Sequence, residues 1–271
     1  MQRSLPKSYK GLYPFRLGTT SFIYPDHYIP NVKMLGPYLN EIELLLFESA
    51  YDSLPSKHEI KELSVLAKEF DITYDIHLPI DIYLGDKDPT IRRRAIESVQ
   101  HVIDLTLPLM PSVYILHLSF NEDSNKTDSI NKWQERIYES MEQLLSTGIK
   151  SRSIAIENLI YPFEWVEKII SSLNLSVCID IGHLILMNAD IKETFEKHHH
   201  KTPIIHLHGV KNNLDHLSLD KLTDNETSDI MEILKAYAGV VIIEVFSYDN
   251  LQASLKYLEK CLNQRRCRDG K

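Results

Sequence analysis

Ile204-Ile-His-Leu-His208 and Val240-Val-Ile-Ile-Glu244 are short apolar runs that end in a metal-binding type of side chain. Six further runs of this apolar, β-branched kind occur along the chain, at 15–20, 42–47, 73–77, 113–117, 154–157 and 176–180. Their length and composition are typical of buried β-strands. The sequence therefore predicts eight strands, spread over most of the chain.

Segments with helical spacing lie between these runs, at 57–70, 91–105, 127–145, 162–173, 223–238 and 251–261. Alternating strands and helices predict a parallel sheet, and eight such units in 271 residues match the size of a (β/α)8 TIM barrel. A doubly wound sheet is the alternative, but no Gly-x-Gly-x-x-Gly follows the first strand, so a dinucleotide site has no support. We expect a single α/β barrel domain over residues 1–271, with 263–271 as a frayed C-terminal tail.

The composition is that of a globular protein, with 43% hydrophobic and 25% charged residues. A formal net charge of −8 disfavours a nucleic-acid partner, because the average surface repels polyanions. Three unevenly spaced cysteines and a polar N-terminus without a signal-like apolar stretch favour a cytoplasmic protein with no membrane association. The oligomeric state is not predicted. The His198-His-His200 triplet is expected to lie in a solvated loop.

Six of the eight runs end in a His, Asp or Glu, namely His77, His117, Glu157, Asp180, His206 and Glu244. In a (β/α)8 barrel these ends open onto one face, where active sites are built. The residues two places earlier, such as Ile115 and Ala155, share the inward direction and predict an apolar layer beneath the polar one. His208 has the same direction as His206 and lies closer to the mouth.

One buried His or Glu is usually a hydrogen-bonded core residue, but six at equivalent strand ends need a cation to balance and pair them. The mixed imidazole and carboxylate set favours Zn²⁺ or Mn²⁺, with one to three ions. His183 extends the set, with a helix cap or a local hydrogen bond as its alternative role, and Asp215 and His216 are either ligands or plain turn residues. Glu48 and Asp75 lie near or within strands and are not assigned as ligands; an internal hydrogen bond is equally consistent with Asp75.

This pattern resembles the xylose-isomerase-like barrel superfamily, from Leu17-Gly-Thr-Thr20 to Ile243-Glu-Val245. In that superfamily a quartet of ligands is typical, and Glu157, Asp180, His206 and Glu244 match it. The endonuclease IV branch adds histidines that His77, His117 and His183 match, together with an Asp-x-His in the loop after strand seven. Here Leu214 stands where that Asp should be, so the resemblance leaves a third metal open, with Asp215 as the substitute.

Four segments resemble the cobamide-remodeling phosphodiesterases of the same superfamily: 17–25, 29–32, 43–48 and 215–219. The resemblance implies a metal-dependent hydrolase that cleaves the nucleotide loop of a corrinoid, a small-molecule substrate, into cobinamide phosphate and an α-ribazole-type nucleoside. It implies that Glu157, His208 and Glu244 act in catalysis. The implied metal ligands are His77, His117, Glu157, Asp180, His183, His206, His216 and Glu244. Tyr24, Tyr83 and Lys211 are candidates for substrate contact, although packing is the simpler role for each.

Three other functions fit parts of the pattern. A sugar isomerase or epimerase would use Glu157 and Glu244 as an acid/base pair but leaves His77 and His117 without a role. An apurinic-site endonuclease would use those histidines, but a net charge of −8 is unfavourable for binding a phosphate backbone. A metal- or corrinoid-binding module without catalysis would not need the three carboxylates.

Overall fold

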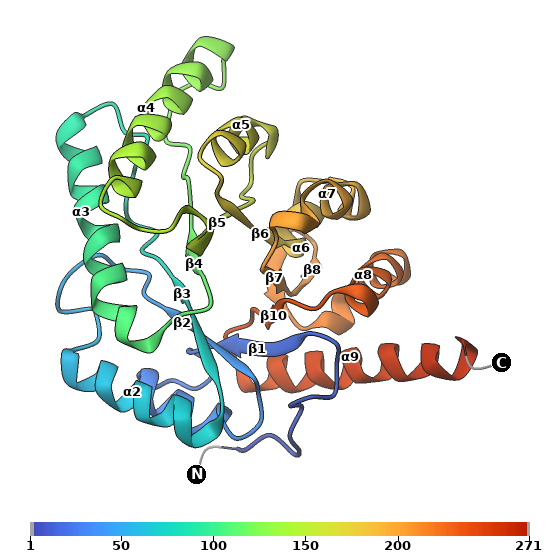
Figure 1. Cartoon of the computed structure of the whole chain (residues 1–271). Helices are drawn as coiled ribbons and strands as arrows, with labels where there is room; N and C mark the ends of the chain where they lie inside the picture. Colours follow the sequence, from blue (N-terminus) through green and yellow to red (C-terminus); the bar gives the residue numbers. More distant parts are fainter. Residues whose placement is uncertain (1–2, 270–271) are drawn as a thin grey trace.

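Eight parallel strands close into a barrel in the computed structural model, which describes residues 3–269, with side chains through 263. The strands follow one another around the barrel in chain order, and β1 closes it against β10 (Figure 1). They are β1 (Arg16–Thr20), β2 (Glu41–Leu45), β3 (Thr73–His77), β4 (Tyr114–Leu116), β5 (Ile154–Glu157), β6 (Ser176–Asp180), β7 (Ile204–Leu207) and β10 (Val240–Ile243). All eight predicted runs form strands, so the predicted TIM barrel is confirmed.

Nine α-helices in the described chain surround the strands (Figure 1). They are α1 (Tyr28–Leu35), α2 (Lys57–Phe70), α3 (Pro89–Thr106), α4 (Thr127–Leu145), α5 (Glu164–Ser172), α6 (Ile181–Leu186), α7 (Ile191–His198), α8 (Asp224–Ala236) and α9 (Tyr248–Asp269). Local sequence fixes several starts: Ser56 with Glu59 and Thr223 with Glu226 form capping boxes at α2 and α8. The segment 263–271, predicted to be frayed, overlaps the end of α9, and residues 270–271 lie outside the described part.

The barrel interior has two unlike sides. Val113, Ile115, Ala155, Cys178, Ile204, Val240 and Ile242 form one buried apolar cluster, which confirms the predicted layer beneath the strand ends. On the opposite side, β2 and β3 bring buried carboxylates inward. Glu41 contacts Arg16 and accepts hydrogen bonds from Thr73 and Ser112, whereas Glu43 and Asp75 have no hydrogen-bond partner. The internal hydrogen bond considered for Asp75 is therefore absent.

A β-hairpin follows β7, where the sequence predicts only a loop. Its strands are β8 (Gly209–Lys211) and β9 (Leu214–Leu217), which pair antiparallel. Asn212 and Asn213 form the turn with positive φ angles of 54° and 60°, a conformation that Asn adopts more readily than most residues. The hairpin carries His216 back over the mouth of the barrel.

The histidine triplet is not the solvated loop that the sequence predicts. His198 is the last residue of α7 and is buried, with its ring against Phe163 and its Nε2 atom 3.0 Å from Glu167. His199 begins a 3-10 turn that runs to Lys201. The prediction failed because residues 191–198 continue an amphipathic helix whose inward face includes His198.

Within residues 3–269, no helix combines the length and the apolar character that crossing a bilayer requires.

Candidate metal centre

Glu157 lies at the centre of a buried cluster at the carboxyl end of the barrel. One carboxylate oxygen lies 3.0 Å from Nε2 of His117 and 3.5 Å from Nε2 of His77. The other lies 3.3 Å from Nδ1 of His183. Nδ1 of His77 faces the Leu78 carbonyl at 3.0 Å, and donation to that carbonyl leaves Nε2 free to face the cluster. Three histidines from separate parts of the chain thus face the one carboxylate of Glu157.

Asp180 shapes the next part of the cluster because it is both the end of β6 and the N-cap of α6. It accepts a hydrogen bond from the His183 backbone N–H at 2.7 Å, which fixes the first turn of the helix. It also lies 3.2 Å from Nε2 of His208. Gly182 makes this approach possible, since a Cβ atom there would lie 1.9 Å from the His208 ring.

His208 and His216 meet through the hairpin. The His216 backbone N–H donates to Nδ1 of His208 at 3.0 Å, so Nε2 of His208 carries the proton that faces Asp180 in the neutral ring. The two rings lie 4.3 Å apart between centroids. His216 has a positive φ of 49°, and its Nδ1 lies 3.2 Å from the Glu244 carbonyl. The hairpin therefore brings His216 into the cluster.

His206 connects the cluster to the barrel interior. Its Nδ1 lies 3.2 Å from Glu244 and its Nε2 lies 3.0 Å from Glu43, and all three side chains are buried. These are ion-pair distances, but neither contact is aligned as a hydrogen bond. The ring therefore has Glu43 on its Nε2 side and the carboxylates of the cluster, Glu244 nearest, on its Nδ1 side.

The electrostatics of the metal-free cluster follow from these contacts. Burial alone would lower the pKa of His183, but Asp180 and Glu157 more than offset this and raise it to about 10. The pKa values of His77, His206 and His208 are also raised, against the effect of burial. The groups that raise them are Glu157 beside His77, Cys178 and Glu43 beside His206, and Asp180 beside His208. Burial raises the pKa of Glu157, but His117 and His206 outweigh this and hold it well below its usual range. The buried carboxylates thus favour the protonated form of the imidazoles beside them.

Five groups of three side chains among the described residues could each hold an ion. Three of these groups have no member in common: His77, His117 and Glu157; Asp180, His206 and Glu244; and His183, His208 and His216. Buried donor atoms without a hydrogen-bond partner, on His206 and Glu244, are those that an ion would satisfy. The donor set therefore fits divalent metal ions, up to three of them.

The structure brings eight predicted ligands and His208 together, with only His117, His183 and His216 partly exposed. Asp215 belongs to none of the five groups. Tyr24 is buried and donates to the Arg3 carbonyl, whereas Tyr83 and Lys211 are exposed. Sequence reasoning missed Glu43, whose signal was only an acidic residue alternating with apolar ones in a predicted strand. It also missed Asn158, whose side chain bonds both the N–H and the carbonyl of Asp180.

The loops around the mouth are acidic. Between each barrel strand and the next α-helix, the segments 21–27, 46–56, 78–88, 117–126, 158–163, 208–223 and 244–247 contain eleven acidic residues and four lysines. The acidic ones are Asp26, Glu48, Asp52, Asp81, Asp86, Asp88, Glu122, Asp123, Asp215, Asp220 and Glu244; the lysines are Lys87, Lys126, Lys211 and Lys221. Such a surface repels a polyanion such as a nucleic-acid backbone.

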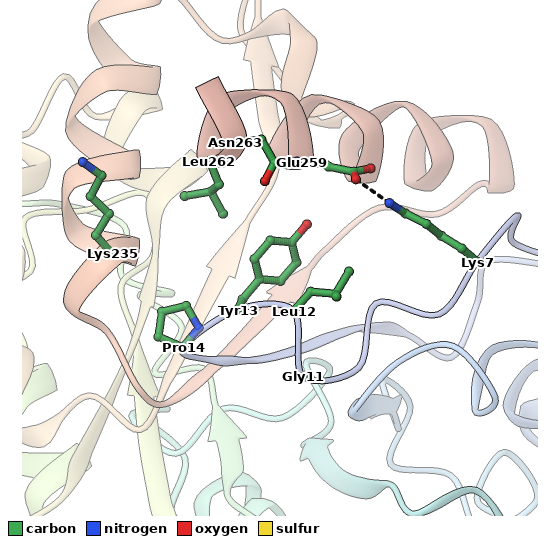
Figure 2. A pocket seen from close by; sticks show the side chains of 9 residues that line it. All are labelled: Lys7, Gly11, Leu12, Tyr13, Pro14, Lys235, Glu259, Leu262 and Asn263. Carbon is green, nitrogen blue, oxygen red and sulfur yellow. Dashed lines mark hydrogen bonds and ion pairs between the residues drawn. The ribbon is translucent and has the colours of Figure 1, made fainter. Parts of the chain in front are cut away.

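A hollow of about 580 Å³ lies away from this cluster (Figure 2). Its lining includes Gly11–Pro14, just before β1, and Lys235, near the end of α8. These residues lie at the amino ends of the strands, opposite the metal cluster. Figure 2 shows Lys7 extended toward Glu259 at its edge, where the two form an ion pair. In TIM barrels this end serves stability rather than chemistry.

Comparison with known proteins agrees with the fold. Residues 37–261 match the family described as Xylose isomerase-like TIM barrel. No curated protein matches the sequence.

The solved structures that resemble the chain include both sugar epimerases and an endonuclease. A D-tagatose 3-epimerase-like protein is 18% identical, with a TM-score of 0.77 over 93% of this chain and 99% of that one. D-psicose 3-epimerase from Clostridium cellulolyticum is 14% identical, with a TM-score of 0.71 over 92% and 99%. Endonuclease IV from Thermus thermophilus is 17% identical, with a TM-score of 0.68 over 92% and 99%. At these identities the likeness establishes the fold alone.

Proposed function

The chain belongs to the xylose isomerase-like TIM barrel family, and we propose that it is a metal-dependent phosphodiester hydrolase. The observation that carries this proposal is the presence of three ligand groups without a shared member around one barrel mouth. An epimerase that works with one ion needs only the quartet of Glu157, Asp180, His206 and Glu244. The five further histidines of the three groups, His77, His117, His183, His208 and His216, are best explained by chemistry that uses several ions.

Divalent ions held by these groups would supply an activated water, neutralise the nonbridging phosphate oxygens and stabilise the leaving alkoxide. The protein's own residues have distinct tasks beside them. Glu157 orients the rings of His77, His117 and His183 toward a common centre. His208, held between Asp180 and the His216 backbone, has its ring fixed at the edge of the cluster, where it would act in catalysis by positioning these two neighbours. Glu244 keeps Nδ1 of His206 directed at the cluster.

For the substrate we propose the nucleotide loop of a cobamide, cleaved to cobinamide phosphate and an α-ribazole-type nucleoside. The sequence segments quoted above support this choice, and so does the acidic mouth. A corrinoid presents one phosphodiester, whereas an apurinic DNA site lies in a polyanion that the acidic loop residues other than the buried Glu244 and the ion-paired Glu122 would repel. We therefore propose a small-molecule substrate, no nucleic-acid partner and a cytoplasmic location.

Sugar epimerisation is the second candidate, and the fold supports it equally because epimerases are among the structural neighbours. In that reaction Glu157 and Glu244 would transfer a proton at the carbon next to a ketone. Both carboxylates face Nδ1 of His206, at 3.7 and 3.2 Å, and this proximity is compatible with the task.

The deciding experiment incubates protein reconstituted with Zn²⁺ or Mn²⁺ with three substrates in parallel: an adenosylated cobamide, an abasic-site oligonucleotide and a panel of keto sugars. Mass spectrometry should detect cobinamide phosphate and the free nucleoside in the first, and only with metal. Cleavage of the oligonucleotide alone would replace the corrinoid by DNA. Epimerised sugar without any diester cleavage would refute the proposed hydrolase.

A further inference from the structure

A second hollow, of about 470 Å³, lies beside the metal cluster, between the loop after β1 and the loop after β10. Phe22, Tyr24, Phe246 and Tyr248 line it. Phe22 and Phe246 are 38% and 42% exposed, although both are large apolar side chains. The Phe246 ring lies 4.9 Å from the ring of His216, so the hollow opens next to the third ligand group.

The walls of this hollow are held in place without a ligand. The Thr20 hydroxyl donates to the Val245 carbonyl at 2.9 Å, which ties the two loops together. The N-terminal segment covers the outer side, because the hydroxyls of Tyr24 and Tyr248 donate to the carbonyls of Arg3 and Ser4. A hollow with fixed walls can bind a rigid group at a small entropic cost.

The charged side chains that line the hollow are paired with each other. Arg3 pairs with Asp249 at 2.6 Å and lies 4.5 Å over the centre of the Tyr248 ring, so the guanidinium is already compensated. Among the residues that the structure describes, no other Asp, Glu, Lys or Arg lines it. Exposed aromatic faces with a compensated charge suit an uncharged planar group, which stacks on rings of this kind.

Resting on the proposed function, we propose that this hollow is a subsite for a planar aromatic group of the diester substrate, a heterocyclic base being the fitting chemical class. Its volume lies within the range of pockets that bind small molecules. A base stacked on Phe22 and Phe246 would place its attached phosphate toward His216 and the neighbouring ligands. The subsite would thus select diesters that carry one aromatic group and reject aliphatic ones.

The test measures binding of two probes that share a phosphonate and contain no ester bond: naphthylmethylphosphonate and methylphosphonate. Calorimetric titration of the Zn²⁺-loaded protein should show at least about tenfold tighter binding of the naphthyl probe. Phe22→Ala should reduce this preference several-fold, and Phe246→Ala likewise. Phe22→Ala is the cleaner variant because Phe246 touches His216. Tyr51→Ala, which removes an exposed ring outside the hollow, should leave the preference intact.

Two results would overturn the subsite: equal binding of both probes by the parent protein, or an unchanged preference in both phenylalanine variants. Hydrolysis of bis(p-nitrophenyl) phosphate by the same preparation tests the proposed function separately. A preparation that prefers the naphthyl probe but cleaves no diester would support the hollow and refute the hydrolase. A preparation that cleaves the diester but binds both probes equally would support the hydrolase and refute the subsite.

Discussion

An oxygen of Glu43 lies 3.0 Å from Nε2 of His206 in the barrel interior, and neither side chain is exposed. The opposite ring nitrogen faces Glu157, Asp180 and Glu244 at 3.7, 4.0 and 3.2 Å. A carboxylate behind a histidine fixes its tautomer and makes the other nitrogen a better metal ligand. Glu43 is therefore a positioning residue for the ligand group that contains His206.

Glu43→Gln should weaken metal binding about tenfold, because the amide no longer provides a negative charge behind the ring. The measurement is competition with a chelator, followed for the parent and the variant. Asp75→Asn is the matched control: Asp75 is an equally buried acid on the neighbouring strand, and burial and Glu43 raise its pKa well above its usual range, which favours the neutral carboxyl. Equal metal affinity of parent and Glu43→Gln would show that Glu43 does not act on His206.

Glu157→Gln should abolish metal-dependent hydrolysis while the barrel stays folded. The variant keeps the size of the side chain but loses the charge that faces His77, His117 and His183. Circular dichroism would verify the fold, and turnover of the substrate identified above would be measured at saturating metal. Full activity would remove Glu157 from the mechanism.

Metal binding should release protons even at pH 8. A histidine ligand must be neutral, and the pKa of His183 is about 10 in the metal-free protein, so an ion that binds below that pH displaces its proton. Apparent affinity should therefore rise with pH in this range. Calorimetry in buffers of different ionisation enthalpy measures the proton count, and His183→Ala should release about one proton fewer. Equal release by both proteins would contradict the assignment of His183 as a ligand.

The fold was readable from the sequence because most of the strands, such as β7 and β10, are short and mainly apolar runs, as is typical of a sheet covered on both faces. The elements that were missed are short or lack a strong pattern. Helix α6 begins directly after its N-cap, the candidate ligand Asp180. The sequence pattern therefore indicates ligands in its first turn and does not indicate a helix. The hairpin after β7 depends on the Asn212-Asn213 turn, which propensity alone does not distinguish from a loop.

The site was readable where a polar residue ends an apolar run, as at Glu157 and His206. It was not readable where a polar residue lies inside a strand. Asp75 lies two residues before His77 and shares its inward direction, but β2 ends in Leu45, so no polar strand end marks Glu43 as inward-facing. Only closure of the barrel places Glu43 against His206, which lies far from it in the sequence.

His198 should make the protein less stable at acidic pH. Burial lowers the pKa of His198 below its ordinary 6.5, with Glu167 opposing the shift only in part. The unfolded chain therefore binds the proton more readily than the folded one. The contribution of neutral His198 to the free energy of unfolding is present above pH 6.5 and is lost as the pH falls through its lowered pKa in the folded protein. Urea unfolding at pH 8 and pH 5 should show a smaller difference for His198→Gln than for the parent. His199→Gln, at the exposed neighbouring position, is the control and should show the same difference between the two pH values as the parent. An equally large difference in His198→Gln would contradict the prediction.

His216→Ala should reduce the number of bound ions by one. His216 completes a ligand group with His183 and His208, whereas the other two groups do not contain it. After loading and gel filtration, elemental analysis should find one ion fewer per chain than in the parent. Asp215→Asn is the matched control from the adjacent position, and its metal content should be unchanged because Asp215 belongs to none of the five groups. Loss of the ion in Asp215→Asn, with His216→Ala unaffected, would instead make Asp215 the ligand and require a shifted hairpin.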